Sequence, residues 1–134
     1  MNPASAETRS GPDNLTVVEV KAFVPALDFA RSMEFYEALG FIRASVFEGI
    51  AYFHSGSASF LLQDFYVREH VANFQMHLLV ENVEAWHERA KKVAERFSVK
   101  IGEPEDRLWA MRDFTLIDPS GVLWRIAQNI PKQG

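Results

Sequence analysis

Apolar and polar side chains alternate along Val17–Val24, a pattern typical of a strand with one buried face. Pro25 has no backbone N–H to donate, so we expect the strand to end there. The following segment, Phe29–Leu39, has apolar residues at helical spacing. Asp28 is a suitable N-cap for this helix, and Gly40 a suitable residue to end it. The pattern therefore predicts a strand followed by a helix.

Three short segments rich in β-branched and aromatic residues follow this helix, separated by turns at Gly49 and Gly56. We expect strands over Ala44–Phe47, Ala51–His54 and Ser59–Phe65. The first half of the chain is thus predicted to have the order βαβββ.

The second half repeats this order. Phe74–Val80 reads as a strand, Asn82 as a second N-cap, and Val83–Phe97 as an amphipathic helix. Three further strands are predicted over Val99–Ile101, Arg112–Ile117 and Leu123–Gln128. The expected fold class is α+β, with two tandem βαβββ modules that form curved mixed sheets around a cleft. The modules fall at about residues 17–67 and 74–129 of one domain, residues 17–129, after a flexible polar tail over residues 1–16.

Composition narrows the classes of function. The chain has 134 residues, which suits one domain, and no cysteine, which excludes disulfides, thiolate nucleophiles and cysteine-based zinc sites. The net charge of −4 argues against a nucleic-acid partner, and no apolar run is long enough for a membrane span. No secretory signal is recognisable, so we expect a cytoplasmic protein. Aromatic residues are in excess, with eleven Phe, three Trp and three Tyr.

Two stretches together indicate a family. PALDFARSMEFYEALGF (residues 25–41) joins the capped helix to an FY…LGF ending, and RDFTLIDPSGVLWRIAQN (residues 112–129) is a strand, a D-P-x-G turn and a last strand. On the duplicated βαβββ order, this pair resembles the glyoxalase/bleomycin resistance/dioxygenase family, also called the vicinal oxygen chelate superfamily. The resemblance covers about residues 17–129 and is closest in look to bleomycin-binding proteins. It implies that each module curls its sheet into a cleft.

Most motif residues are expected to be structural. Phe35, Tyr36, Leu39 and Phe41 are predicted to pack the first helix on its sheet. The segment Asp118–Gly121 is predicted to form a tight turn.

The resemblance implies where a metal would bind. Metal-dependent members of the family hold a divalent ion with His and Glu side chains on the first and last strands of each module. Counting from the two helix starts, those positions fall on Lys21, Leu61, Gln75 and Arg125. Lys21 and Arg125 are cations and Leu61 is apolar, so these three side chains cannot ligate a metal. The sequence therefore predicts no metal and no cofactor. A two-residue register slip keeps the same face and would put His77 in place of Gln75 and Phe23 in place of Lys21.

The face with these positions is the predicted ligand-binding cleft, because it mixes aromatic, aliphatic and polar groups. The face toward the helices is predicted to hold Val20, Ala22, Leu62, Met76, Leu78, Trp124 and Ile126. Candidate ligand-binding residues are Lys21, Phe23, Phe47, Phe53, Leu61, Gln63, Gln75, His77, Trp109 and Arg125.

The two cations of this face leave two interpretations open. In one, Lys21 and Arg125 contact an anionic ligand. In the other, they pair with nearby carboxylates, for which the candidates are Glu19, Glu48, Asp64 and Asp113. Unpaired cations would fit poorly with a cationic drug such as bleomycin.

Two functions follow from the resemblance. The first is a metal-free, homodimeric protein that binds a bleomycin-like antibiotic or another flat, partly apolar compound, without catalysis. The second is a metal-dependent glyoxalase, lactoylglutathione lyase-like, or an extradiol dioxygenase-like enzyme. A metal-free reaction with His77 as general base, beside Glu48 or Asp64, has no spacing to support it.

Overall fold

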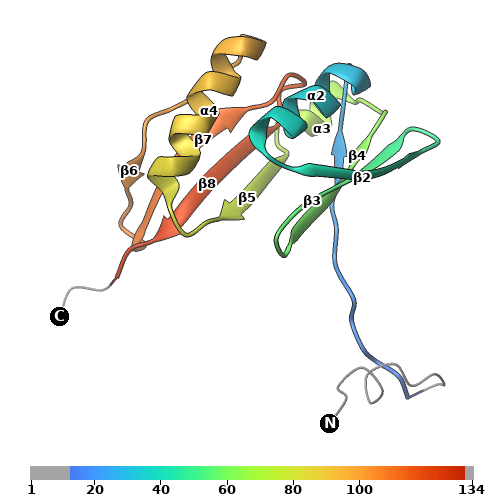
Figure 1. Cartoon of the computed structure of the whole chain (residues 1–134), viewed down its shortest axis with the longest axis horizontal. Coiled ribbons are helices and arrows are strands. Elements are labelled where there is room, and N and C mark those ends of the chain that lie inside the picture. The colour runs from blue at the N-terminus through green and yellow to red at the C-terminus, as the bar shows by residue number, and fades with distance from the viewer. Residues whose placement is uncertain (1–12, 132–134) are drawn as a thin grey trace.

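A computed structural model describes residues 13–131 of the chain. They form two four-stranded sheets, each covered by a helix (Figure 1). The first module comprises β1 (Phe23–Pro25), α2 (Phe29–Leu39), β2 (Ile42–Phe47), β3 (Ile50–Ser55) and β4 (Ala58–Gln63). A short helix, α3 (Arg68–Val71), connects it to the second module, which comprises β5 (Gln75–Leu79), α4 (Val83–Phe97), β6 (Glu105–Asp106), β7 (Met111–Ile117) and β8 (Leu123–Asn129).

The two sheets have the same topology. Their strand orders are β1-β4-β3-β2 and β5-β8-β7-β6, so the first strand of each module pairs with the last. That pair is parallel in both sheets, and the other pairs are antiparallel. The predicted α+β fold class with a duplicated βαβββ order is therefore confirmed.

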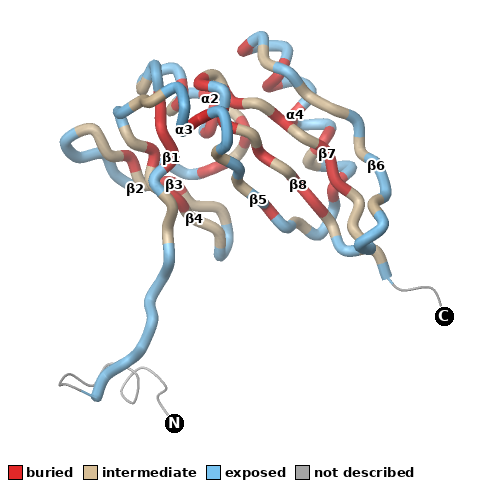
Figure 2. The backbone as a smooth tube through the Cα atoms, turned by 180° about the vertical axis from the view of Figure 1, so that it is seen from behind, coloured by how far each residue is buried: buried red, intermediate tan, exposed pale blue. Residues whose placement is uncertain are grey.

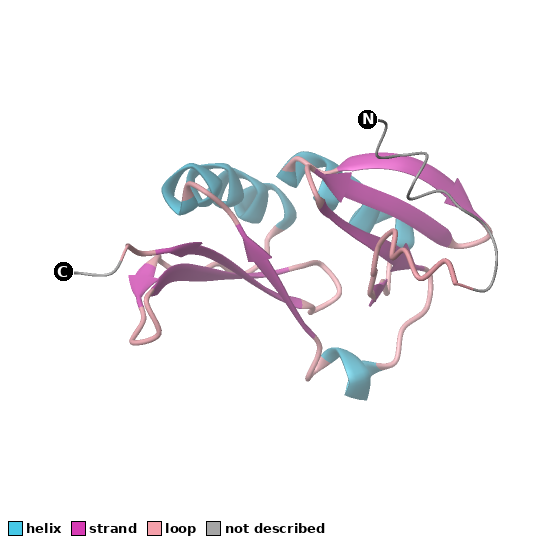
Figure 3. Ribbon diagram, turned by 90° about the horizontal axis from the view of Figure 1, so that it is seen from below, coloured by secondary structure: helices cyan, strands magenta, loops and turns pink. Residues whose placement is uncertain are grey.

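The predicted caps position both long helices. The Asp28 carboxylate accepts a hydrogen bond from the Arg31 N–H at 3.1 Å, and the Asn82 side chain accepts one from the Ala85 N–H at 3.0 Å. Gly40 ends α2 with a φ of 116°, a left-handed conformation that glycine adopts without a Cβ clash. Each helix lies on one side of its sheet (Figure 3), so the other side of each sheet has no long helix on it.

The first strand is shorter than its pattern predicts. Only Phe23–Pro25 pair with β4, and Val18 and Val20 are 93% and 90% exposed rather than turned toward the helices. Figure 2 shows this N-terminal stretch extending away from both sheets. The physical reason is the length of the partner strand: β4 begins at Ala58, so the residues before about Val20 run past its start.

The other differences between the predicted and the observed elements are local. The Val99–Ile101 segment forms only a single bridge, between Ile101 and Leu116, and α3 was not predicted. Residues 1–12 of the predicted tail lie outside the described part, and residues 13–16 form neither helix nor strand.

An aromatic core joins the two modules, with the Tyr36 ring of α2 at its centre. Five rings have their centroids 4.9–6.2 Å from that of Tyr36, and they come from both modules: Phe35, Phe41, Phe53, Phe60 and Trp124. Eight of the seventeen aromatic side chains are buried in the core. The expectation that Phe53 forms a wall of the cleft is corrected, because its side chain is fully buried among these rings.

A buried hydrogen-bond network at the same place connects the two sequence motifs. The Tyr36 hydroxyl donates to Asp118 Oδ2 at 2.5 Å and accepts from the Trp124 indole N–H at 2.8 Å. Asp118 Oδ1 accepts from the backbone N–H groups of Ser120 and Val122, both at 2.8 Å, which fixes the predicted turn. Burial raises the pKa of Tyr36 well above its usual value and also raises the pKa of Asp118.

Substituting Tyr36→Phe is expected to lower the free energy of unfolding by about 1–3 kcal/mol, because it leaves a buried carboxylate oxygen and an indole N–H without their partner. Urea unfolding followed by circular dichroism measures this. Tyr66→Phe is the matched control, since Tyr66 is half-buried and outside the network. Equal stability of the two variants would contradict the proposed importance of the network.

Candidate functional site

The open side of the first sheet carries most of the side chains predicted for the first half of the cleft. Phe23 lies opposite Leu61 in the strand register, and Leu61 lies opposite Tyr52. Gln63 lies one pleat further along β4. These four side chains are exposed or half-buried, whereas the alternate residues Val24 and Leu62 are fully buried. The predicted alternation is thus observed in β1 and β4.

The open side of the second sheet carries the other half. His77 lies opposite Arg125, and Gln75 lies opposite Leu123. The alternate residues Leu78, Trp124 and Ile126 are buried toward the helix side, as predicted. The remaining candidates lie at hairpin ends: Phe47, 74% exposed, ends β2, and Trp109, 61% exposed, lies between β6 and β7.

Glu19 organises the polar part of the first face. Its carboxylate accepts hydrogen bonds from Lys21 Nζ at 2.7 Å, the Tyr52 hydroxyl at 3.0 Å and the Ser59 hydroxyl at 2.5 Å. These bonds, that from Lys21 above all, lower the pKa of Glu19 from 4.5 to about 2. The hydrogen bond to Glu19 raises the pKa of Tyr52. Of the two interpretations for Lys21, pairing is therefore observed.

Asp113 plays the corresponding part on the second face. Its Oδ1 accepts from Arg125 at 3.1 Å and from Arg107 at 3.0 Å, and its side chain is fully buried. Asp113 Oδ2 has no hydrogen-bond partner among the described residues. Glu105 lies 3.7 Å from the Arg107 guanidinium. Arg125 is thus also paired, and two carboxylates accompany the two guanidiniums of this face.

The cavities found among the described residues do not coincide with the two open faces. Phe23 and Gln63 line a small cavity of about 130 Å³ beside the α3 connection. His77 borders two larger cavities, of about 640 and 550 Å³, between the modules. The small cavity and the two larger ones share no residue. The larger cavities are lined by Leu78, which faces the helix side, so neither of them is the open face of the second sheet. Glu19 and Ser59 of the first face also border the 550 Å³ cavity.

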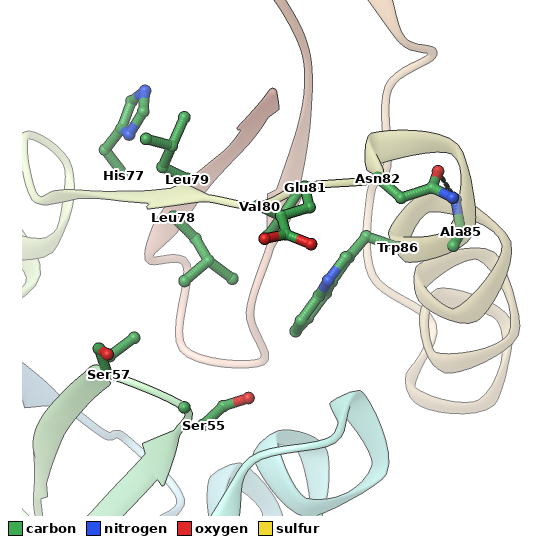
Figure 4. Close-up of a pocket in the computed structure, with 12 residues that line it drawn as sticks. Ser55, Ser57, His77, Leu78, Leu79, Val80, Glu81, Asn82, Ala85 and Trp86 are labelled. Atoms are coloured by element: carbon green, nitrogen blue, oxygen red, sulfur yellow. Dashed lines mark hydrogen bonds between the residues drawn. The ribbon is translucent and has the colours of Figure 1, made fainter. Parts of the chain in front are cut away.

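The 640 Å³ cavity lies between β5 and the β3–β4 turn (Figure 4). Leu78, Glu81 and Trp86 point into it from the second module, and Ser55 and Ser57 lie across from them, while His77 points away. Sequence analysis did not single out Glu81 or Ser57, because they lie in a connection and a turn and belong to no motif. Trp86 lies in the first turn of α4 and is only half-buried.

A family model supports the resemblance. The model described as Glyoxalase/Bleomycin resistance protein/Dioxygenase superfamily matches residues 18–126. The chain belongs to this superfamily. A comparison with curated proteins gave no match.

Solved structures of superfamily members share the fold. A bleomycin-binding protein complexed with bleomycin matches with a TM-score of 0.73 at 23% identity, covering 84% of this chain and 99% of its own. A bleomycin resistance determinant encoded on the transposon Tn5 matches with a TM-score of 0.72 at 22% identity, covering 84% and 98%. TnmS3, an antibiotic binding protein from Streptomyces sp. CB03234, matches with a TM-score of 0.68 at 23% identity, covering 86% and 98%.

The strand register tests whether this superfamily member can hold a metal of the kind the family implies. The residues directly opposite each other on the first and last strands are Phe23 with Leu61, and His77 with Arg125. Of these four side chains only His77 has a lone pair for a metal, and it faces a guanidinium. The described residues contain no group of three or more His, Cys, Asp or Glu side chains suited to a metal ion. The donor set therefore does not fit a divalent metal at this position.

Two further observations concern the general base considered above and a membrane-spanning helix. His77 lies on the second sheet, whereas Glu48 and Asp64 follow strands of the first, so the structure gives no support to a general base formed from these residues. Among the described residues, no helix is long and apolar enough to cross a membrane.

The Glu19 carboxyl is expected to titrate near pH 2 rather than near 4.5. Since the pKa is lowered in the folded chain, its contacts stabilise the fold above pH 4.5 and are lost as the pH falls toward 2. Carbon-detected NMR of the side-chain carboxyl measures the midpoint. In Lys21→Met the midpoint should rise toward 4.5, and in the control Lys100→Met, which changes an exposed lysine elsewhere, it should not move. A wild-type midpoint near 4.5 would contradict the prediction.

Proposed function

We propose that this protein binds a flat, partly apolar small molecule of the bleomycin-like antibiotic class, without catalysis. In this proposal the ligand lies between the open face of the first sheet of one copy and the open face of the second sheet of another. The observation that carries the proposal is the make-up of the two open sheet faces. Each mixes exposed or half-buried apolar and polar side chains, and neither is covered by a long helix of the described residues.

The chemistry of the two faces favours stacking and hydrogen bonding. Phe23 is 51% exposed beside Leu61, and the rings of Phe47 and Trp109 stand out at hairpin ends. Large exposed rings provide the flat apolar walls that ligand sites use. Gln63 on one face and Gln75 on the other supply neutral donors and acceptors.

The ion pairs neutralise the side-chain cations that would otherwise repel a cationic ligand. Lys21 is paired with Glu19, and Arg125 shares Asp113 with Arg107, which also lies near Glu105. Counted together, three cations face three carboxylates, so the faces have no net positive charge to repel a cation. The fold relatives that bind bleomycin or another antibiotic are consistent with this ligand class.

Bleomycin is expected to bind the purified full chain in isothermal titration calorimetry, with a change in tryptophan fluorescence. Trp109→Ala should weaken binding about tenfold or more, because it removes an exposed stacking surface, without changing the unfolding temperature. The matched control is Leu27→Ala, a 64% exposed apolar residue outside both faces. Equal affinity of the two variants would remove Trp109 from the site, and no heat or fluorescence change with bleomycin would argue against this ligand.

The metal-dependent alternative is tested on the same protein. Elemental analysis after purification without chelators is expected to find only substoichiometric Ni, Zn, Fe or Mn. A stoichiometric metal whose removal abolishes an activity would overturn the proposal and favour a glyoxalase- or dioxygenase-like enzyme.

A further inference from the structure

Three hydrogen-bond donors on the open face of the first sheet converge on one carboxylate. Lys21 Nζ donates to Glu19 Oε1 at 2.7 Å, and the hydroxyls of Tyr52 and Ser59 both donate to Oε2, at 3.0 and 2.5 Å. Both carboxylate oxygens are therefore engaged, one by an ammonium group and the other by two hydroxyls. Hydrogen bonds to a charged group are stronger than those between neutral groups, so this set of donors is well suited to hold a carboxylate.

The sheet positions the two hydroxyls independently of Glu19. Tyr52 lies on β3 and Ser59 on β4, and the register pairs Tyr52 with Leu61, two residues after Ser59. Because alternate residues of a strand share a face, Ser59 lies on the same side of the sheet as Tyr52. Lys21 Nζ lies 5.4 Å from the centre of the Tyr52 ring, a distance at which a cation is attracted to an aromatic face. We therefore expect the three donors to remain together when the Glu19 carboxylate leaves.

The acceptor, by contrast, comes from a segment outside the sheet. Glu19 lies before β1, in residues 13–20, which form neither helix nor strand. The backbone of residues 17–20 has no hydrogen-bond partner among the described residues. Its neighbours Val18 and Val20 are 93% and 90% exposed, and Figure 2 shows this stretch leading away from the sheets. A second carboxylate can therefore take the place of that of Glu19 without breaking any strand pairing.

An apolar cavity lies directly beside this carboxylate. Glu19, with its two neighbours, and Ser59 border the cavity of about 550 Å³ between the modules. Its other walls include the apolar side chains of Phe60, Met76 and Leu78. A molecule with its acidic group at the position of the Glu19 carboxylate can therefore place an apolar body against these walls. Ligand sites commonly have this volume and this make-up, mainly apolar with a few polar groups that fix the orientation.

The charge of the donor set indicates a monoanion. Lys21 contributes one positive charge and the two hydroxyls contribute none, so a single carboxylate neutralises the site, as that of Glu19 does. A phosphate group carries about 1.5–2 negative charges at neutral pH and would leave the excess without a partner. The side chains of Lys21 and Glu19 are only 26% and 29% exposed, so water and salt screen this pair less than a fully exposed one.

We propose that Lys21, Tyr52 and Ser59 form a binding site for an organic monocarboxylate with an apolar body, and that Glu19 occupies this site in the ligand-free chain. The ligand carboxylate exchanges with that of Glu19, so the charge and the hydrogen bonds are conserved, and the apolar body enters the 550 Å³ cavity. This site goes beyond the proposed function, because it lies within one chain and takes another class of ligand. Since Glu19 is tethered beside the donors, it competes at a high effective concentration.

Isothermal titration calorimetry of the full chain with 2-naphthoate at pH 7 tests the site. Glu19→Ala is expected to bind 2-naphthoate about tenfold or more tighter than the wild-type chain, because the intramolecular competitor is gone. The control Glu95→Ala removes an exposed glutamate of α4 and should leave the wild-type affinity unchanged. Adding Lys21→Met to Glu19→Ala should cancel the gain, whereas adding Lys100→Met, at an exposed lysine elsewhere, should not. The alcohol 2-naphthylmethanol, with the same rings and no charge, should bind Glu19→Ala and the wild-type chain equally.

A second measurement uses the wild-type chain, so it does not depend on how well the variants fold. With 2-naphthoate above its measured dissociation constant, the NMR signal of the Glu19 side-chain carboxyl carbon is expected to move toward that of the exposed Glu95, because its three donors are lost. An unmoved Glu19 signal would overturn the proposal. Equal affinity of Glu19→Ala and the wild-type chain, a gain that survives Lys21→Met, or an equal gain for 2-naphthylmethanol would overturn it as well.

Discussion

The hydrogen bonds between Tyr36, Asp118 and Trp124 fix how the two modules sit together. Tyr36 belongs to the helix of the first module, and the other two residues belong to the last turn and last strand of the second. All three are buried, so their polar groups need partners, and the Tyr36 hydroxyl supplies one to each of the other two across the modules. The FY…LGF and D-P-x-G motifs, which are unremarkable separately, are thus two halves of one contact. Ser120 extends it, because its hydroxyl accepts from the Leu27 N–H at 2.8 Å.

This contact has a consequence for ligand binding. Because the modules share a core on the side of their helices, their open sheet faces are left on the outside of the pair, as Figures 1 and 3 show. The predicted ligand-binding residues are divided between these two faces. The proposed function therefore places the face of a second copy against each of them.

The charged residues of the faces also depend on the tertiary structure. Lys21 and Arg125 are both neutralised by carboxylates within reach, so the faces need not select anions. The register that puts Arg125 opposite His77 also places a guanidinium where a metal would need a ligand. Binding rather than metal chemistry is therefore what the arrangement of these side chains favours.

Local patterns in the sequence were enough to predict the two capped helices, the D-P-x-G turn, the duplicated strand order and the two candidate faces, since caps, turns and alternation depend on near neighbours in the chain. Predictions of which side chains are buried were wrong where contacts between distant segments decide the burial. Phe53 is core because the rings of Tyr36 and Phe60 surround it, and His87 is buried in place of Trp86 because its ring reaches the Gly102 carbonyl. The alternation of Val17–Val24 correctly indicates a chain built to be a strand. That the residues before about Val20 have no strand beside them was decided by the start of β4 at Ala58, because a strand forms only where a partner lies beside it.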